Sequence, residues 1–387
     1  MNRYLLTLGL LASGLAGCQQ TKKADTATSD TTTSIDSASA RNNPADTGGP
    51  ASGQAVPTVG SPVLLTKLPA KYNTPDGLAL APDGTVYLSM PNLANNTYPG
   101  VLLKIVGDSV QLVSSLPAHP DTKHACPMDL AFGPDGNLYY ADNQYENSKD
   151  FKSRLMRIDI KNGKVGAVTP VVTGFGLSNA VVWRGNTIYV TDSEWNLGTK
   201  PGDDKGSAVF HFTLDELNKG EIKLKPNTID PHVLATFTTT VNETGLDNGA
   251  DGLDYDEKGN FYTGTFGDGT LYKLTLKPDG SLAKKEKLTV NKAIPCVDGL
   301  IIDRATNTMY LCNSRENAIM TVNLINGNVA TLAQNGDTDG HDGRLDQPAE
   351  VLLKGKRLYI SEYDKPEKAF VNTKADEVHT MSYIDLK

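Results

Sequence analysis

Six segments of this 387-residue chain place a carboxylate or amide side chain just before a short apolar run. A turn follows the run, and then a second apolar segment with a tyrosine near its centre. The six polar residues are Asp76, Asp129, Asn179, Asp251, Asp298 and Glu350. Oxygen atoms of carboxylate and amide groups are the ligands that hard divalent cations prefer. If the fold brings the six side chains together, they can bind such a cation.

Each copy has the pattern of a β-hairpin. The turns are built on Asp-Gly, Lys-Gly or Gly-Asn in most copies, and further alternating segments such as residues 101–115 and 318–333 follow the hairpins. The six marked residues are 53, 50, 72, 47 and 52 positions apart. Four antiparallel strands recurring about every 50 residues are typical of a propeller blade. The sequence therefore predicts an all-β, six-bladed β-propeller with four-stranded antiparallel blades.

Two irregularities in the repeat carry further predictions. The spacing of 72 indicates an insertion after the third hairpin, with a helical turn at residues 214–218. The sixth copy has one recognisable strand after its hairpin, while an unassigned strand at residues 61–69 precedes the first copy. We expect this N-terminal strand to complete the last blade, because that would close the ring and remove an exposed edge.

The N-terminal residues predict an exported, lipid-anchored protein. Residues 1–17 have the layout of a secretory signal peptide, and Leu15-Ala16-Gly17-Cys18 resembles the bacterial lipobox, in which the cysteine carries the lipid. The alternative is that Cys18 is an incidental thiol in a cleaved leader. Residues 18–60 are rich in Ser, Thr, Ala and Asp and predict a disordered tether. Because Gln19 is not the aspartate of an inner-membrane signal, the expected location is the outer membrane of a bacterial envelope, on either face.

Charge and cysteine content limit the partners of the remaining domain, residues 61–387. The formal net charge is −8, and outside the tether the basic residues form no block, which excludes nucleic acid as a partner. Membrane contact is expected only through the lipid. Cys126, Cys296 and Cys312 allow one disulfide or none. Their spacings do not resemble a thiolate metal site.

Convergence of the six polar residues is the central structural expectation. In a propeller the first strand of each blade lines the central channel, so residues entering that strand should face one mouth of it. Five carboxylates there raise one another's pKa values, and a divalent cation would relieve the repulsion. Calcium is the first candidate, and magnesium or manganese are alternatives. Another reading is that such aspartates only bond turn amides, the role expected of Asp83, Asp135 and Asp256 in the hairpin turns.

Two stretches carry a family resemblance. LSNAVVWRGNTIYVTDS (177–193) and GADGLDYDEKGNFYTGT (249–265) are similar to signatures of the gluconolactonase and senescence-marker-protein family, and residues 335–364 resemble an NHL-type repeat. The resemblance implies that Asn179 and Asp251 hold a metal, with Asp76 in place of the family's first-blade Glu. The chain departs from the family in lacking its Gly-Glu-Gly-Pro-x-Trp opening, in having Met128-Asp129 for an Asn-Asp pair, and in having Ala250 for a Pro.

The expected function is that of a metal-dependent hydrolase of lactones. The predicted metal ligands are Asp76, Asp129, Asn179, Asp251 and Glu350. The metal would polarise the carbonyl of a lactone or sugar derivative, and Asp251 or Asp298 would accept a proton from water. The alternatives are a non-catalytic propeller that binds a glycan, peptide or envelope protein, and a lyase.

Two histidines are further candidates for site residues. His124, in the loop entering the second blade, is a candidate base, although a loop histidine is more often an ordinary surface residue. His341 lies in GDTDGHDGRLD (336–346), a stretch that does not have the spacing of an EF-hand calcium loop.

Overall fold

The computed structural model describes residues 56–161, 163–197, 204–240 and 245–387. The described residues all belong to one compact unit. The predicted signal peptide, Cys18 and most of the tether lie outside them. No helix in the described part of the chain is long and apolar enough to cross a membrane.

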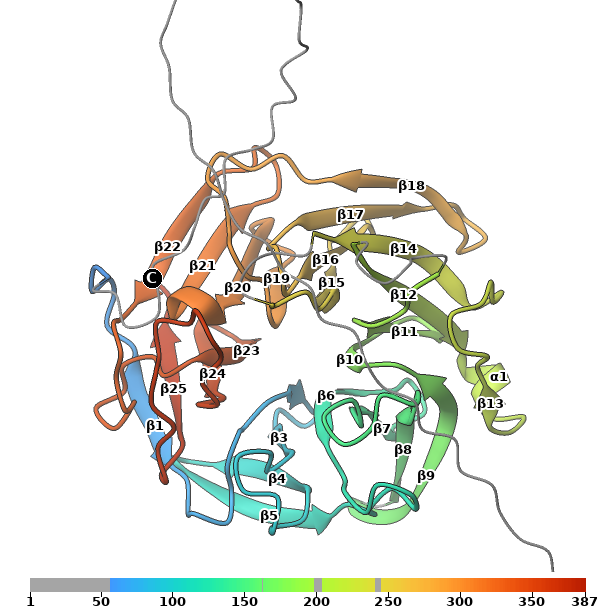
Figure 1. Cartoon of the computed structure of the whole chain (residues 1–387), viewed down its shortest axis with the longest axis horizontal. Coiled ribbons are helices and arrows are strands. Elements are labelled where there is room, and N and C mark those ends of the chain that lie inside the picture. The colour runs from blue at the N-terminus through green and yellow to red at the C-terminus, as the bar shows by residue number, and fades with distance from the viewer. Residues whose placement is uncertain (1–55, 162, 198–203, 241–244) are drawn as a thin grey trace, which may run out of the picture. The chain divides into compact units, whose positions relative to one another are not determined.

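Six β-sheets form the blades of a propeller, as the sequence predicts, and Figure 1 shows them arranged in a ring. The first three blades are β2 (Leu78–Leu80), β3 (Val86–Met90), β4 (Val101–Val106) and β5 (Ser109–Ser115); β6 (Pro127–Phe132), β7 (Leu138–Asp142), β8 (Ser153–Lys161) and β9 (Lys164–Phe175); and β10 (Ser178–Arg184), β11 (Thr187–Asp192), β12 (Lys205–Thr213) and β14 (Val233–Thr239). The last three are β15 (Ala250–Tyr255), β16 (Phe261–Thr265), β17 (Leu271–Leu276) and β18 (Leu282–Lys287); β19 (Leu300–Asp303), β20 (Thr308–Asn313), β21 (Ala318–Asn323) and β22 (Val329–Gln334); and β23 (Pro348–Lys354), β24 (Arg357–Glu362), β25 (Thr380–Asp385) and β1 (Val63–Lys67).

Closure of the ring follows the prediction. Strand β1 pairs antiparallel with β25, with Val63 opposite Tyr383 and Lys67 opposite Thr380. The N-terminal strand is therefore the outer strand of the sixth blade. Just before it, the backbone of Val59 exchanges two hydrogen bonds with Gln334 at the end of β22. The two ends of the domain are thus joined by main-chain hydrogen bonds.

The predicted insertion follows the third hairpin. It contains the short helix α1 (Leu214–Leu217), whose N-terminus is capped by reciprocal bonds between Thr213 and Glu216. After α1 the chain forms β13 (Ile222–Lys223), which pairs parallel with β9 of the second blade. The insertion therefore adds a fifth strand to the neighbouring blade before the chain returns as β14.

Asp-Gly and Lys-Gly turns shape the hairpins for a local reason. Gly84, Gly136 and Gly259 have φ angles of 85°, 78° and 79°, which a side chain would disfavour. In the first turn Asp83 accepts the amide of Thr85 at 2.9 Å, and Asp135 and Asp256 accept the amides of Asn137 and Asn260 in the same way. The structural role predicted for these three aspartates is confirmed.

The hydrophobic core is divided among the interfaces between blades. In the described residues, six buried clusters each join two neighbouring blades, such as Tyr139 of β7 with Val190 of β11 and Phe210 of β12. Cys126, Cys296 and Cys312 are buried in this core as free thiols, so the alternative without a disulfide holds. Packing between blades fixes the inner strands around the channel.

Candidate functional site

The tyrosines of the second strands give a common register for the six blades. Tyr87, Tyr139, Tyr189, Tyr262, Tyr310 and Tyr359 lie opposite Ala79, Ala131, Val182, Asp254, Ile301 and Leu352 on the inner strands, respectively. These pairs allow equivalent residues to be compared directly from blade to blade.

Counting back along the inner strands separates the six marked residues into two groups. Three positions before the tyrosine partner are Asp76, Met128, Asn179, Asp251, Asp298 and Ala349. One residue later are Gly77, Asp129, Ala180, Gly252, Gly299 and Glu350. Asp129 and Glu350 are therefore offset by one residue from the other four. Successive side chains of a strand face opposite sides, so the offset directs these two differently.

A cavity of about 250 Å³, here called the mouth cavity, lies at one end of the channel. Asp76, Asn179, Asp251 and Asp298 all line it, and each comes from a different blade. The first three are at most 9% exposed. Further residues of its wall are Met128, Asn143, Tyr145, Glu146, Asn248, Phe266, Gln347, Tyr363, Lys365 and Glu367. The predicted convergence thus holds for four of the six residues.

Hydrogen bonds orient the polar groups of the mouth cavity. The Asn179 amide nitrogen donates to Asp251 Oδ1 at 2.7 Å, which leaves the Asn179 carbonyl oxygen as a potential ligand. The Ser314 hydroxyl oxygen lies 2.7 Å from both Asp298 Oδ2 and the carbonyl oxygen of Pro348. A hydroxyl has one proton to donate, and the carbonyl can only accept. If Ser314 donates to Pro348, a protonated Asp298 can donate to Ser314.

Burial and mutual repulsion disfavour ionisation of the mouth carboxylates. Burial, followed by the charge of Asp298, raises the pKa values of Asp76 and Asp251 well above their ordinary range. Burial also raises the pKa of Asp298 to about 7, although hydrogen bonds from Ser314 and the Gly299 amide oppose the rise. A cation among these oxygens would favour the ionised forms.

Asp129 and Glu350 do not line the mouth cavity, although the charge of Asp129 contributes to the raised pKa values of Asp76 and Asp251. Asp129 and Glu350 line a second cavity of about 250 Å³ together with Asp254, which the sequence analysis did not select. Asp129 accepts the amides of Leu130 and Val181 at 2.7 and 2.8 Å. Glu350 accepts the amide of Val351 at 2.7 Å.

Asp254 has the same kind of environment. It accepts the Ile302 amide at 2.8 Å and forms an ion pair with Arg304 at 2.6 Å. Asp129 and Asp254 thus each bind a main-chain amide of the following blade, whereas Glu350 binds its own strand. The only sequence signal for Asp254 was its place opposite Tyr262 in the repeat register.

Glycine after three of the mouth aspartates has its own structural reason. A Cβ atom on Gly77 would collide with the backbone of Asp129, and one on Gly252 would lie 2.5 Å from the carbonyl oxygen of Asp298. A Cβ on Gly299 would collide with the Glu350 carboxylate. The Asp-Gly pair therefore combines a side chain directed to the mouth with close approach of the neighbouring blade.

The two histidines considered from sequence lie elsewhere. His124 lines a different cavity, beside Pro91, Leu93 and Tyr98. The Nε2 atom of His341 lies 3.2 Å from the carbonyl oxygen of Val378. Neither is among the residues of the mouth cavity.

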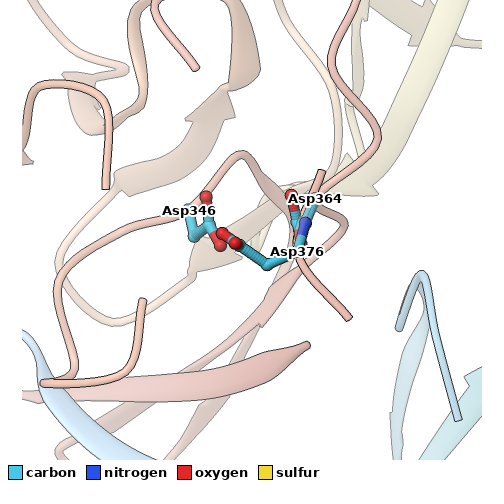
Figure 2. A group of neighbouring side chains, drawn as sticks. All are labelled: Asp346, Asp364 and Asp376. Carbon is cyan, nitrogen blue, oxygen red and sulfur yellow. The ribbon is translucent and has the colours of Figure 1, made fainter. Parts of the chain in front are cut away.

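A second group of acids, the blade-six acid cluster, consists of Asp346, Asp364 and Asp376 and could hold a metal ion. Figure 2 shows the three side chains next to one another, and one oxygen of each lies within 4.8 Å of the others. Burial and the neighbouring acids raise the pKa of Asp346 to about 10, and burial raises that of Asp364 to about 8. Sequence reasoning missed this cluster, because Asp346 ends a stretch set aside for its lack of EF-hand spacing.

Comparisons with known proteins support the fold. No family model and no curated protein matches the sequence. The PQQ-bound aldose sugar dehydrogenase of Streptomyces coelicolor is similar in structure, with a TM-score of 0.53, 15% identity, and coverage of 85% of this chain and 99% of that one. A putative gluconolactonase has a TM-score of 0.51, 13% identity and coverage of 85% and 92%. A luciferin-regenerating enzyme has a TM-score of 0.54, 12% identity and coverage of 84% and 94%.

The chain is a six-bladed β-propeller distantly similar in structure to gluconolactonases and PQQ sugar dehydrogenases. At this level of identity the likeness concerns the fold alone. The residues of the mouth cavity must therefore carry any argument about function.

Proposed function

We propose that the mouth cavity binds a divalent cation and that the protein hydrolyses a lactone or related ester of a sugar. The observation that carries the proposal is the convergence of Asp76, Asn179, Asp251 and Asp298 from four blades into one cavity. Local turn formation does not require this convergence. The two residues that are farthest apart in the sequence, Asp76 and Asp298, are separated by 222 positions.

The donor set fits a hard cation. Three carboxylates and an amide oxygen suit calcium, with magnesium and manganese as alternatives, and they offer no thiolate or imidazole for softer metals. Asp76, Asn179 and Asp251 would hold the ion. When bound, it would act as a Lewis acid on the carbonyl of the ester.

Asp298 is the preferred proton acceptor of the proposed reaction. Its pKa of about 7 suits a general base near neutral pH, and Ser314 fixes the position of its Oδ2 atom. Water attacks the carbonyl carbon while Asp298 takes one of its protons. The ring C–O bond then breaks, and the leaving oxygen takes the proton, which gives a hydroxy acid. Asp251 is the second candidate for this role.

The wall of the cavity favours a hydroxylated substrate. Asn143, Asn248 and Gln347 offer amide groups, and Tyr145 and Phe266 offer aromatic surface. This combination suits a sugar ring, which has polar edges and apolar faces. Two structural neighbours, a putative gluconolactonase and an aldose sugar dehydrogenase, are named for substrates of this class, which supports the proposal.

Location is a separate part of the proposal. A lipid on Cys18 and the tether of residues 18–60 would hold the domain at the outer membrane. Replacing Cys18 by Ala should move the protein from the membrane fraction to the soluble fraction. Retention of the variant in the membrane would contradict lipid anchoring.

Activity can be tested with D-glucono-δ-lactone and a panel of other aldonolactones, by following acid release with a pH indicator. Protein treated with chelator should be inactive, and calcium, magnesium or manganese should restore activity. Asp298→Asn should be inactive under the same conditions. Asp342→Asn is a matched control, because Asp342 is an exposed loop residue paired with Arg344.

Absence of hydrolysis with every cation would contradict the proposed activity. If the protein then still binds sugars, and Asp251→Asn leaves that binding intact, the alternative of a non-catalytic binding propeller would hold instead.

A further inference from the structure

Each acid of the blade-six acid cluster has one buried oxygen without a hydrogen-bond partner in the described part of the chain. These atoms are Asp346 Oδ2, Asp364 Oδ1 and Asp376 Oδ2. On two of the residues the other oxygen is engaged, because Asp346 Oδ1 accepts from the Asn372 amide and Asp364 Oδ2 accepts the backbone amide of Asp376. A buried carboxylate oxygen without a partner is costly. Three of them together require a ligand or bound protons.

Two neutral side chains at the cluster each have an oxygen without a hydrogen-bond partner in the described part of the chain. Asn372 is fully buried, and its Oδ1 atom has no partner among the described residues, although its amide group touches Asp346. Thr380 is 1% exposed, and its hydroxyl also has no described partner. Thr380 Oγ1 and Asp346 Oδ2 both lie against Gly340. These are two further oxygen donors beside the three carboxylates.

Within the described residues, no lysine or arginine forms an ion pair with the three acids of the cluster. The charges that act most strongly on Asp346 are those of Asp364, Glu362, Asp376 and Asp339, all acidic. His379 Nδ1 lies 3.6 Å from Asp364 Oδ2, but the same nitrogen accepts the Thr74 amide at 3.2 Å and therefore carries no proton. Glu362 is already satisfied, since it accepts from Ser382 and from the Asp346 amide.

We propose that Asp346, Asp364 and Asp376, with the oxygens of Asn372 and Thr380, bind a divalent cation of the calcium class. Calcium takes six to eight oxygen ligands and accepts irregular geometry, and oxygens of the three carboxylates lie within 4.8 Å of one another. Asp376 is only partly buried, so water can complete the coordination. This site is separate from the mouth cavity, whose residues it does not share.

The cation would join two loops of the sixth blade. Asp346 ends the loop between β22 and β23, whereas Asp364 and Asp376 lie near the two ends of the loop between β24 and β25. The second loop also supplies Tyr363, Lys365 and Glu367 to the wall of the mouth cavity. Cation binding would therefore order one side of the cavity without taking part in chemistry there.

Limited proteolysis of the purified full chain tests this site without an activity assay. The β24–β25 loop contains two exposed trypsin sites, Lys368 and Lys374. Calcium added to protein treated with chelator should slow cleavage at both by about tenfold or more, because a loop must open locally before it is cut. Mass spectrometry of the fragments identifies the sites, and calorimetry gives the calcium affinity.

Variants assign the effect to the cluster. Asp376→Asn should abolish the protection, and because Asp376 is partly exposed the variant should fold. Asp342→Asn, in the other loop, should keep full protection, and so should Asp251→Asn in the mouth cavity. The proposal is overturned if calcium does not protect the wild-type loop, if Asp376→Asn is protected as well as wild type, or if Asp251→Asn loses the protection. These results do not depend on lactone hydrolysis.

Discussion

The two ends of the channel carry similar acids with opposite surroundings. At the mouth, Asp76, Asp251 and Asp298 face a cavity, and the amide group of Asn179 bonds to one of them. Asp129 and Asp254 line the other cavity and bind main-chain amides of the following blade. The inner strand β15 contributes to both groups, with Asp251 and Asp254, and the other acids come from different blades. Position on the strand therefore decides whether an acid is available to a ligand or holds neighbouring blades together.

Removing one acid from each end should produce the largest difference. Asp251→Asn should lower hydrolysis by about 10³-fold, because it removes a proposed metal ligand and adds no group able to replace its charge. Asp129→Asn should change the rate less than about threefold, because its carboxylate bonds backbone amides instead. Steady-state kinetics and calcium titration of both variants measure the difference. Equal losses in the two would remove the distinction.

The dependence of stability on pH should also distinguish the two ends. The pKa values of Asp129 and Asp298 are raised to about 7 in the folded protein, mainly by burial, compared with about 4 when unfolded. Between these values the folded state binds more protons, so the free energy of unfolding of the metal-free protein should fall as pH rises from about 4 to about 7. The loss should amount to a few kcal/mol, measured by urea denaturation.

Calcium should separate the contributions of the two ends to this pH dependence. It should remove the part due to the mouth acids, since a bound cation keeps them ionised, and leave the part due to Asp129. Asp298→Asn should therefore reduce the calcium-sensitive part, and Asp129→Asn the calcium-insensitive part. A slope of opposite sign in the metal-free protein would contradict the assigned pKa shifts.

The smallest expected effect is on stability, and it comes from replacing a glycine that follows a mouth aspartate. Gly252→Ala should lower the free energy of unfolding by about 1–3 kcal/mol, because its Cβ would press on the carbonyl oxygen of Asp298. Gly336→Ala is the matched control, since open space surrounds that position, and it should change stability by no more than about 0.5 kcal/mol. Thermal denaturation compares them, and equal effects would argue against close packing as the reason for the glycine.

Architecture was predictable from the sequence because it repeats. The repeated hairpin pattern predicts six blades, and the extra strand at residues 61–69 predicts that β1 closes the ring. Turn aspartates such as Asp83 were predictable too, since their partners lie two residues away.

The site was only partly predictable. Aligning the copies on their acids rather than on their tyrosines hid the one-residue offset of Asp129 and Glu350, and that offset reverses the direction of a side chain. Asp364 and Asp376 were not predictable from spacing, because they meet Asp346 only through the course of the β24–β25 loop.

An anomalous difference map from crystals of the protein soaked in manganese would locate bound cations directly. We expect a peak in the mouth cavity bounded by Asp76, Asn179 and Asp251, and a second peak at Asp346 in the blade-six acid cluster. No peak at the mouth, or a peak among Asp129, Asp254 and Glu350 instead, would contradict the claim that strand position makes the mouth acids available to a cation.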